Sequence, residues 1–168
     1  GPDGVVNLLD ADNLNEDLDR ETDEDPVVFT GAAGYTLRSF TAVDGAFTIA
    51  FDIQQTPGTS GYVFAKTDGS GSRFYGLYSS RATQALTFFY RTPGSTTQHL
   101  VSFNFGITDG ARVVVVLTVD GAVATLRTSS GYVQAVVLAG TLDDCAPASS
   151  SCVFSLGQRI APGGQSTL

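Results

Sequence analysis

The stretch Ala111-Arg-Val-Val-Val-Val-Leu-Thr-Val-Asp-Gly-Ala-Val-Ala-Thr-Leu-Arg-Thr-Ser-Ser130 decides the fold class. It contains two runs rich in β-branched residues, joined at Asp120-Gly121. Asp-Gly between two such runs is a strong hairpin signal, because a type I′ turn needs positive φ at both of its central residues. Residues 113–119 are predicted to form a central strand, since consecutive valines are stiff at χ1 and pack well on a pleated surface.

The chain from residue 27 onward repeats this pattern of short β-rich runs separated by turn residues. The runs recur at roughly 8- to 12-residue intervals, which is typical of a sandwich or a barrel. In residues 46–54 the apolar side chains from Phe47 to Ile53 occupy every second position, which predicts one buried and one solvent-exposed face. The predicted strands are residues 27–30, 35–39, 46–54, 61–67, 73–79, 85–92, 98–105, 112–120, 122–128, 132–139 and 152–156.

Length and composition are those of a single all-β domain. A chain of 168 residues is long enough to bury roughly 70% of the surface that its unfolded form exposes. Hydrophobic residues make up 42% of the chain, which supports a core, and the 19 glycines fit many turns. The sequence therefore predicts an antiparallel two-sheet β-sandwich with little or no helix.

Charge is distributed unevenly along the chain. Ten of the 17 acidic residues lie in the first 25 positions, so the net charge of −8 belongs largely to one end. Nucleic acid is not expected as a partner, because phosphate binding needs clustered Lys and Arg, and Lys66 is the only lysine. Direct membrane insertion is not expected either, since uninterrupted apolar runs such as residues 113–117 reach only five residues, whereas a span needs about 20.

The two cysteines, Cys145 and Cys152, flank a loop-forming spacer of Ala, Pro and Ser. A disulfide between them is geometrically easy and would stabilise the fold by roughly 2 to 3 kcal/mol. Their spacing is too long for a zinc knuckle, and no further cysteine is available to complete four ligands. The pair is predicted to form a disulfide, which indicates an oxidising, extracellular compartment. The alternative is two reduced, buried thiols.

The ends of the chain are expected to differ from the sandwich. Residues 1–2 look like the scar of a tag-removing protease, and residues 3–26 are an acidic segment expected to dock only in part. This segment has oxygen side chains in EF-hand-like spacing, but Leu18 stands where that loop needs glycine. It is interpreted as a plain solvated segment, with calcium binding as the alternative. Residues 160–168 are expected to be a tail or linker, which leaves residues 27–159 for the sandwich.

The order of the β-rich runs resembles that of a known family. The runs that carry the likeness are Phe47-Thr-Ile-Ala-Phe-Asp-Ile53, Gly61-Tyr-Val-Phe-Ala65, Phe74-Tyr-Gly-Leu-Tyr78, Ala85-Leu-Thr-Phe-Phe89, Ile107-Thr-Asp-Gly-Ala-Arg112, Val115-Val-Leu-Thr-Val-Asp-Gly121 and Leu156-Gly-Gln-Arg159. Over about residues 5–159 they resemble the laminin G-like family, and within it the thrombospondin N-terminal-like branch. The resemblance implies a concanavalin-like jelly roll in an extracellular multidomain protein, such as a matrix protein or an adhesion receptor.

Two features depart from the family pattern. Asp109-Gly-Ala-Arg112 stands where the family has an aromatic residue and a histidine before its central strand. Many laminin G modules bind calcium at a rim, starting from an Asp just before the strand matched here by residues 74–78, and Ser72-Arg73 occupies that place. No cofactor is therefore expected, with Ca²⁺ as the alternative. The loop carboxylates that could substitute, interpreted mainly as turn formers, are Asp68, Asp143 and Asp144.

The reactive residues do not indicate an enzyme. His99 is the only histidine and is expected to cap the core at the start of a strand, and no Gly-x-Ser-x-Gly elbow accompanies it. The three glutamates, Glu16, Glu21 and Glu24, all lie in the acidic segment, whereas a glycoside hydrolase needs two carboxylates flanking its substrate. We therefore expect no catalytic residues.

Aromatic residues on both faces of the predicted strands at residues 73–79 and 85–92 indicate a binding surface. One face must be core, and the other would expose Phe89 and a tyrosine unless a flanking segment buries them. Exposed aromatic rings suit a protein interface or stacking on sugar rings. The candidate binding surface is Tyr75, Tyr78 and Phe89.

The sequence thus predicts a non-catalytic extracellular recognition module for cell adhesion or matrix interaction. It would bind a protein ligand or neighbouring domains through loops or a sheet face. A lectin-like carbohydrate-binding domain is the first alternative, and a structural spacer is the second.

Overall fold

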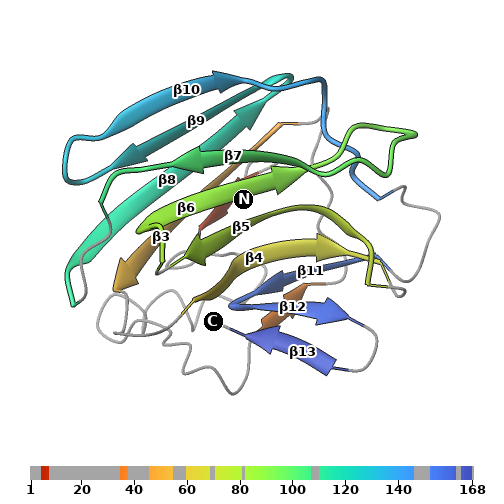
Figure 1. Cartoon of the computed structure of the whole chain (residues 1–168), viewed down its shortest axis with the longest axis horizontal. Helices are drawn as coiled ribbons and strands as arrows, with labels where there is room; N and C mark the ends of the chain where they lie inside the picture. The colour runs from red at the N-terminus through yellow and green to blue at the C-terminus, as the bar shows by residue number, and fades with distance from the viewer. Residues whose placement is uncertain are drawn as a thin grey trace.

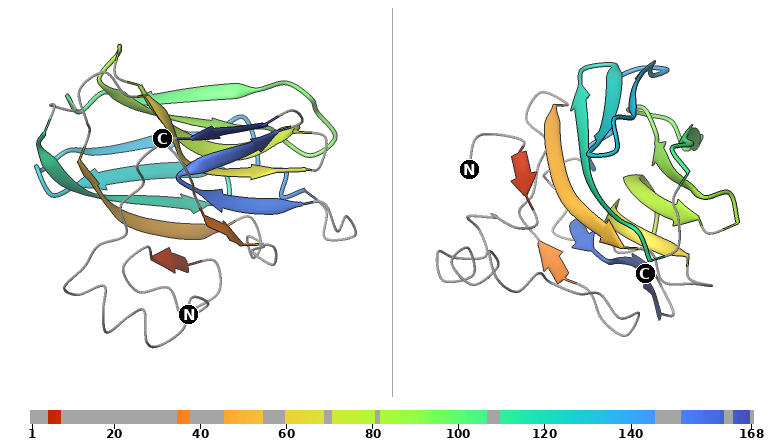
Figure 2. Two further views of the ribbon diagram at one scale, coloured as in Figure 1. Left: turned by 90° about the horizontal axis from the view of Figure 1, so that it is seen from below. Right: turned by 90° about the vertical axis from the view of Figure 1, so that its left-hand side faces the viewer.

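The chain forms a β-sandwich of two curved sheets in a computed structural model (Figures 1 and 2). The structure describes residues 5–7, 35–37, 46–54, 60–68, 71–80, 82–106, 110–145, 152–161 and 164–167. None of these residues is helical, and accordingly no described helix could cross a membrane. Neighbouring strands of the two sheets are antiparallel except for β1 and β3, which pair in parallel. The predicted all-β sandwich is confirmed.

The two sheets are built from strands distant in sequence, as a jelly roll requires. The five-stranded sheet has the order β1 (Val5–Asn7), β3 (Phe47–Gln54), β8 (Arg112–Asp120), β9 (Val123–Thr128) and β10 (Val133–Val137). The six-stranded sheet has the order β2 (Tyr35–Leu37), β11 (Val153–Leu156), β4 (Gly61–Thr67), β5 (Arg73–Ser80), β6 (Ala85–Tyr90) and β7 (His99–Phe103). The run of valines at residues 113–119 lies in β8, at the centre of its sheet, as predicted.

The inner faces of both sheets supply one dry core. In β3 the alternation read from the sequence is confirmed, since every second side chain from Phe47 to Ile53 is buried and those between are half-buried. Phe47 of one sheet stacks on Tyr75 of the other, with ring centroids 5.4 Å apart. Burying a side chain of this size contributes about 1.5 to 3 kcal/mol. The fully buried large side chains of this core are Tyr75, Phe51, Phe64, Phe88, Phe103, Phe154, Ile49, Leu77, Leu86, Leu117 and Leu126.

The hairpin between β8 and β9 has a different turn from the expected one. Asp120 pairs with Val123, so the two central residues of the turn are Gly121 and Ala122. Only Gly121 has a positive φ, +57°. Positive φ at the first central residue alone is the requirement of a type II′ turn, which takes Gly at that position. The sequence located the hairpin correctly, but the predicted type I′ turn was wrong.

A third, two-stranded sheet lies against β4, outside the sandwich proper (Figure 1). It consists of β12 (Gln158–Ala161) and β13 (Gly164–Thr167). The stretch expected to be a tail or linker, residues 160–168, thus contains strand residues that pair with each other. Its position explains why β4 is buried along its whole length rather than at alternate residues.

The other predicted strands match observed ones to within a few residues, except that residues 27–30 lie outside the described residues. Most of the acidic segment and its calcium-like pattern also lie outside them. Only β1, a three-residue strand, is described near the N-terminus.

Candidate functional site

The three aromatic residues predicted to form a binding surface lie on two different faces of the six-stranded sheet. Tyr75 is completely buried on the inner face, where it pairs across the ladder with Lys66 and Tyr90. Phe89 and Tyr78 point to the outer face, but Phe89 is only 2% exposed and Tyr78 is half-buried. Tyr75 and Phe89 are therefore buried, and the three candidate residues do not form one exposed surface.

Phe89 is buried because it belongs to a small outer aromatic cluster, made of Tyr62, Ala65, Tyr78 and Phe89. The rings of Tyr62 and Phe89 meet edge to face with centroids 5.9 Å apart. The Arg73 guanidinium lies 5.2 Å from the centre of the Phe89 ring and donates a hydrogen bond of 3.3 Å to the Tyr62 hydroxyl. This arrangement matches the alternative that the aromatic face is covered.

The exposed apolar surface lies instead on the other sheet. Of the five large hydrophobic side chains that are exposed in the described part of the chain, four are Val114, Val123, Val133 and Val137. All four point outward from β8, β9 and β10, and Val123 stands directly opposite Val137 in the ladder. The fifth, Leu100, lies on β7 of the six-stranded sheet. We call the outer surface of β8, β9 and β10 that carries these four valines the valine face.

Polar pairs link β8 of the valine face to the neighbouring strand β3. Arg112 makes an ion pair with Asp52, with 2.6 Å between Nη2 and Oδ2, and the hydroxyls of Thr48 and Thr118 lie 3.3 Å apart. On the opposite side, β10 ends the sheet. On this surface polar side chains also lie between the valines, since Thr118 pairs with Thr125 and Arg127 pairs with both Val116 and Val133 in the ladder.

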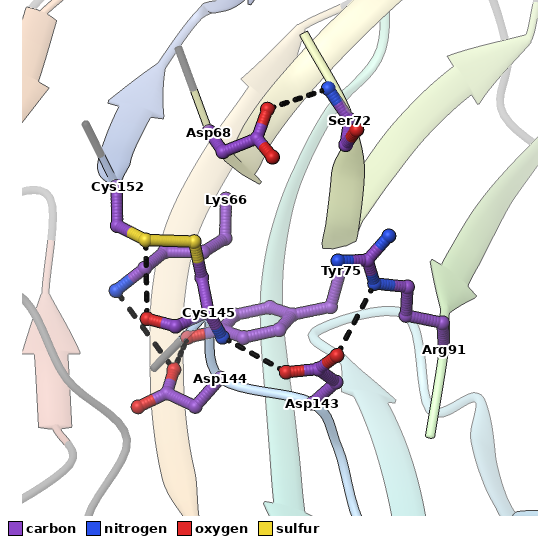
Figure 3. Close-up of a disulfide and its surroundings, with 9 residues drawn as sticks. All are labelled: Lys66, Asp68, Ser72, Tyr75, Arg91, Asp143, Asp144, Cys145 and Cys152. Atoms are coloured by element: carbon purple, nitrogen blue, oxygen red, sulfur yellow. Dashed lines mark hydrogen bonds and ion pairs between the residues drawn. A yellow bond between two sulfur atoms is a disulfide. The ribbon is translucent and has the colours of Figure 1, made fainter. Parts of the chain in front are cut away.

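A buried charged group lies at the rim of the sandwich, beside the disulfide (Figure 3). The Asp144 carboxylate accepts a hydrogen bond of 2.7 Å from the Tyr75 hydroxyl, and its Oδ1 lies 3.8 Å from the ammonium nitrogen of Lys66. Lys66 is only 3% exposed, so burial lowers its pKa, while the nearby Asp144 acts in the opposite direction. Burial, together with the charge and hydrogen bond of Asp144, raises the pKa of Tyr75 well above its usual value.

The adjacent residue, Asp143, anchors the same loop through different partners. Its carboxylate lies 3.3 Å from Nε of Arg91 and accepts a hydrogen bond from the Cys145 backbone N–H (Figure 3). The Arg91 guanidinium in turn lies 3.5 Å from the centre of the Phe74 ring. The predicted disulfide between Cys145 and Cys152 is confirmed, with 6.1 Å between the Cα atoms. Two carboxylates and a disulfide therefore fasten the loop after residue 142 onto the six-stranded sheet.

Comparison with known proteins identifies the fold. No protein-family model and no curated protein sequence matches the chain. Among solved structures, 83% of the chain superposes on domains LG4-5 of the mouse laminin α1 chain with a TM-score of 0.58 and 13% sequence identity. The chain has a laminin G-like jelly-roll fold. It covers about a third of the laminin structure, 35% of its length.

Two further structures are similar at lower TM-scores. A mutant of Trypanosoma rangeli sialidase displaying trans-sialidase activity matches with a TM-score of 0.45 and 17% identity, over 74% of this chain and 19% of that one. The Caenorhabditis elegans galectin LEC-6 matches with a TM-score of 0.43 and 9% identity, over 83% of this chain and 90% of that one. The laminin G-like fold confirms the resemblance read from the sequence, whereas the thrombospondin-like branch stays a prediction.

The rim of the sandwich has different residues from those of the calcium site that the family resemblance implies. Arg73, the first residue of β5, is directed to the outer aromatic cluster. Of the carboxylates that could substitute, Asp143 and Asp144 each face a cationic side chain, and Asp68 accepts a hydrogen bond of 2.9 Å from the Ser72 backbone N–H. Within the described ranges, no three acidic, His or Cys side chains come together as metal ligands would.

His99 has the structural position expected from the sequence. It begins β7 and stacks on Tyr90 with ring centroids 5.0 Å apart. The Tyr90 hydroxyl accepts a hydrogen bond from the Ala139 backbone N–H, so this pair links β6 to the segment after β10. The three glutamates lie outside the described residues.

Proposed function

We propose that this laminin G-like domain is a non-catalytic extracellular recognition module that binds a protein partner through the valine face. The observation that carries the proposal is that four of the five exposed large hydrophobic side chains described lie on one sheet face. Exposed apolar side chains gathered on one face of a domain are typical of interaction sites. As a module of this kind, the domain would serve a multidomain adhesion receptor or a matrix protein.

The chemistry of the face favours a protein over a carbohydrate. Sugar rings are bound by stacking on exposed aromatic rings, but the described exposed apolar residues are aliphatic. The outer aromatic rings of the six-stranded sheet, Tyr62 and Phe89, are buried in their own cluster. β-branched side chains suit a protein interface, since valine has little rotamer freedom to lose on binding.

The disulfide supports an extracellular setting, because such bonds persist mainly in oxidising compartments. A catalytic role has no support from the described rim, where the carboxylates of Asp143 and Asp144 are engaged by Arg91, Tyr75 and Lys66.

The proposal is tested by binding of fluorescently labelled, tetramerised domain to decellularised extracellular matrix. The double variant Val114→Lys, Val123→Lys places charge on the face without a substitution in the edge strand β10. It should reduce binding at least ten-fold, while the control Leu100→Lys, on the other sheet, should bind like the wild type. Circular dichroism checks that each variant is folded.

Three outcomes would contradict the proposal. Unchanged binding of the double variant would place the site elsewhere. Loss of binding after glycosidase treatment of the matrix, but not after protease treatment, would favour the carbohydrate alternative. Absence of binding by the wild type to any matrix would favour a spacer.

A further inference from the structure

The strand β10 presents a free edge. It is the last strand of the five-stranded sheet, and in the described part of the chain no strand pairs with it on the side away from β9 (Figure 1). Leu138 N–H donates to the Ala122 carbonyl, and Thr128 N–H donates to the Tyr132 carbonyl, at 2.7 and 3.0 Å. In an antiparallel ladder these bonds alternate, so even-numbered residues of β10 face β9. The backbone groups of Val133, Ala135 and Val137 therefore point to the open side.

This edge lacks the features that normally block strand pairing. Natural edge strands carry charged side chains, prolines or bulges that prevent pairing with another chain. The sequence of β10 is Val-Gln-Ala-Val-Val, and its register with β9 is regular over all five residues. Val133 and Val137 are 57% and 79% exposed, the latter being the most exposed large hydrophobic residue described. The edge is thus both unprotected and apolar.

We propose that β10 is a self-association site, at which it pairs antiparallel with β10 of a second copy of this chain. The residues whose backbone groups point outward are centred on Ala135. A two-fold axis at Ala135 would place Val133 opposite Val137 of the second copy, with each exchanging both backbone hydrogen bonds. The same register brings Val133 and Val137 side chains together on the outer surface. The two five-stranded sheets become one continuous sheet, and the two valine faces become one surface.

Charge does not oppose this pairing. The nearest charged side chain on the neighbouring strand is Arg127, which lies opposite Val133. In the proposed dimer the two Arg127 side chains are offset by about 13 Å along the strands and about 14 Å across them. Their separation of roughly 19 Å exceeds the Debye length of about 8 Å at physiological salt. Beyond residue 25 the chain has eight basic and seven acidic residues, so the body of the domain is nearly neutral.

The size of the contact predicts a weak dimer. A five-residue strand buries less than the roughly 1,200 Å² at the lower end of stable interfaces, so association should depend on concentration. This inference does not rest on the proposed function, because a partner can bind the valine face of a single copy. The variants that alter the tested surface also differ between the two tests, which share only the control Leu100→Lys.

The test is sedimentation equilibrium of the whole chain at increasing concentration, up to about 1 mM, a range chosen for a contact of this size. The wild type should shift from monomer towards dimer, and Val137→Lys and Ala135→Pro should each weaken association at least ten-fold. Proline is tolerated at Ala135 because its N–H is not used in the ladder with β9. Leu100→Lys, which adds the same charge on the other sheet, should associate like the wild type.

Amide hydrogen exchange gives a residue-level readout that does not depend on a variant. Exchange at Val133, Ala135 and Val137 should slow as the wild-type concentration rises, while exchange at Gln134 and Val136, already bonded to β9, should not change. A wild type that stays monomeric overturns the proposal, even if a different protein adds a strand at this edge. Dimerisation that persists unchanged in folded Val137→Lys and Ala135→Pro also overturns it, because the dimer would then use another surface.

Discussion

Truncation of Phe89 to alanine tests whether the outer aromatic cluster is covered or is an open binding surface. Phe89 is 2% exposed and packs against Tyr62, Ala65 and Tyr78, with Arg73 over its ring. Phe→Ala substitutions at buried sites cost about 3 to 5 kcal/mol, and this site belongs at the lower end because the cluster is small. A loss of about 3 kcal/mol lowers the Tm by roughly 6 to 12 °C in a domain of this size.

The matched control is Leu100, which stands directly opposite Phe89 on β7 and is 67% exposed. Leu100→Ala should change the free energy of unfolding by no more than about 0.5 kcal/mol, as is usual for surface sites. Urea denaturation of both variants with the disulfide intact measures the difference. If Phe89→Ala cost less than about 1 kcal/mol with an unchanged m-value, Phe89 would be open and the original aromatic surface would be restored.

Two further predictions concern the six-stranded sheet. Because the pKa of buried Tyr75 is raised, the unfolded chain releases the phenol proton near pH 10 while the folded chain keeps it, so the free energy of unfolding should fall above about pH 10. Tyr75→Phe should flatten this fall in urea titrations between pH 8 and 11, and an identical slope would contradict the assignment. Gly76→Ala should destabilise the fold by about 1 to 3 kcal/mol, since its Cβ would lie 2.5 Å from the Phe64 carbonyl oxygen and would also meet the Phe89 ring. Wild-type stability of this variant would show that β5 is not packed this closely.

The periodicity of the sequence predicted which residues share a strand face, but not which face is covered. Alternation in β3 gave its buried side correctly, because polar residues occupy the other side. In β5 and β6 both faces are apolar, so the sequence could not tell that Phe89 would be covered. Cover of Phe89 on the outer face comes from Tyr62 and Ala65 of β4, which are distant from it in sequence. The register of β4 against β5 shifts between Tyr62 and Phe64 and between Lys66 and Thr67. Such shifts interrupt the simple alternation of side chains along a strand, so the spacing of residues in the sequence does not indicate them.

The valine face was missed although its signal was present in the sequence. Four successive valines at residues 113–116 must place apolar side chains on both faces of β8. Such a run usually indicates a strand that is covered on both sides, and the sequence was interpreted only as a central strand. Likewise, the contact of Lys66 with Asp144 joins residues far apart in sequence, and only the fold brings them together.

The outer face of the six-stranded sheet and the valine face differ in how much apolar surface a partner could bury. The Phe89 ring already packs against Tyr62 and Arg73, so a partner would have to displace these contacts before gaining its own. On the valine face the side chains of Val123, Val133 and Val137 are exposed in the free domain, so their burial adds contact without breaking any described packing. Burial of apolar area contributes about 25 cal/mol per Å², and the χ1 angles of these valines are already restricted, so little entropy is lost. Association through this surface is therefore favoured even though its residues are smaller than the aromatic ones first predicted from the sequence.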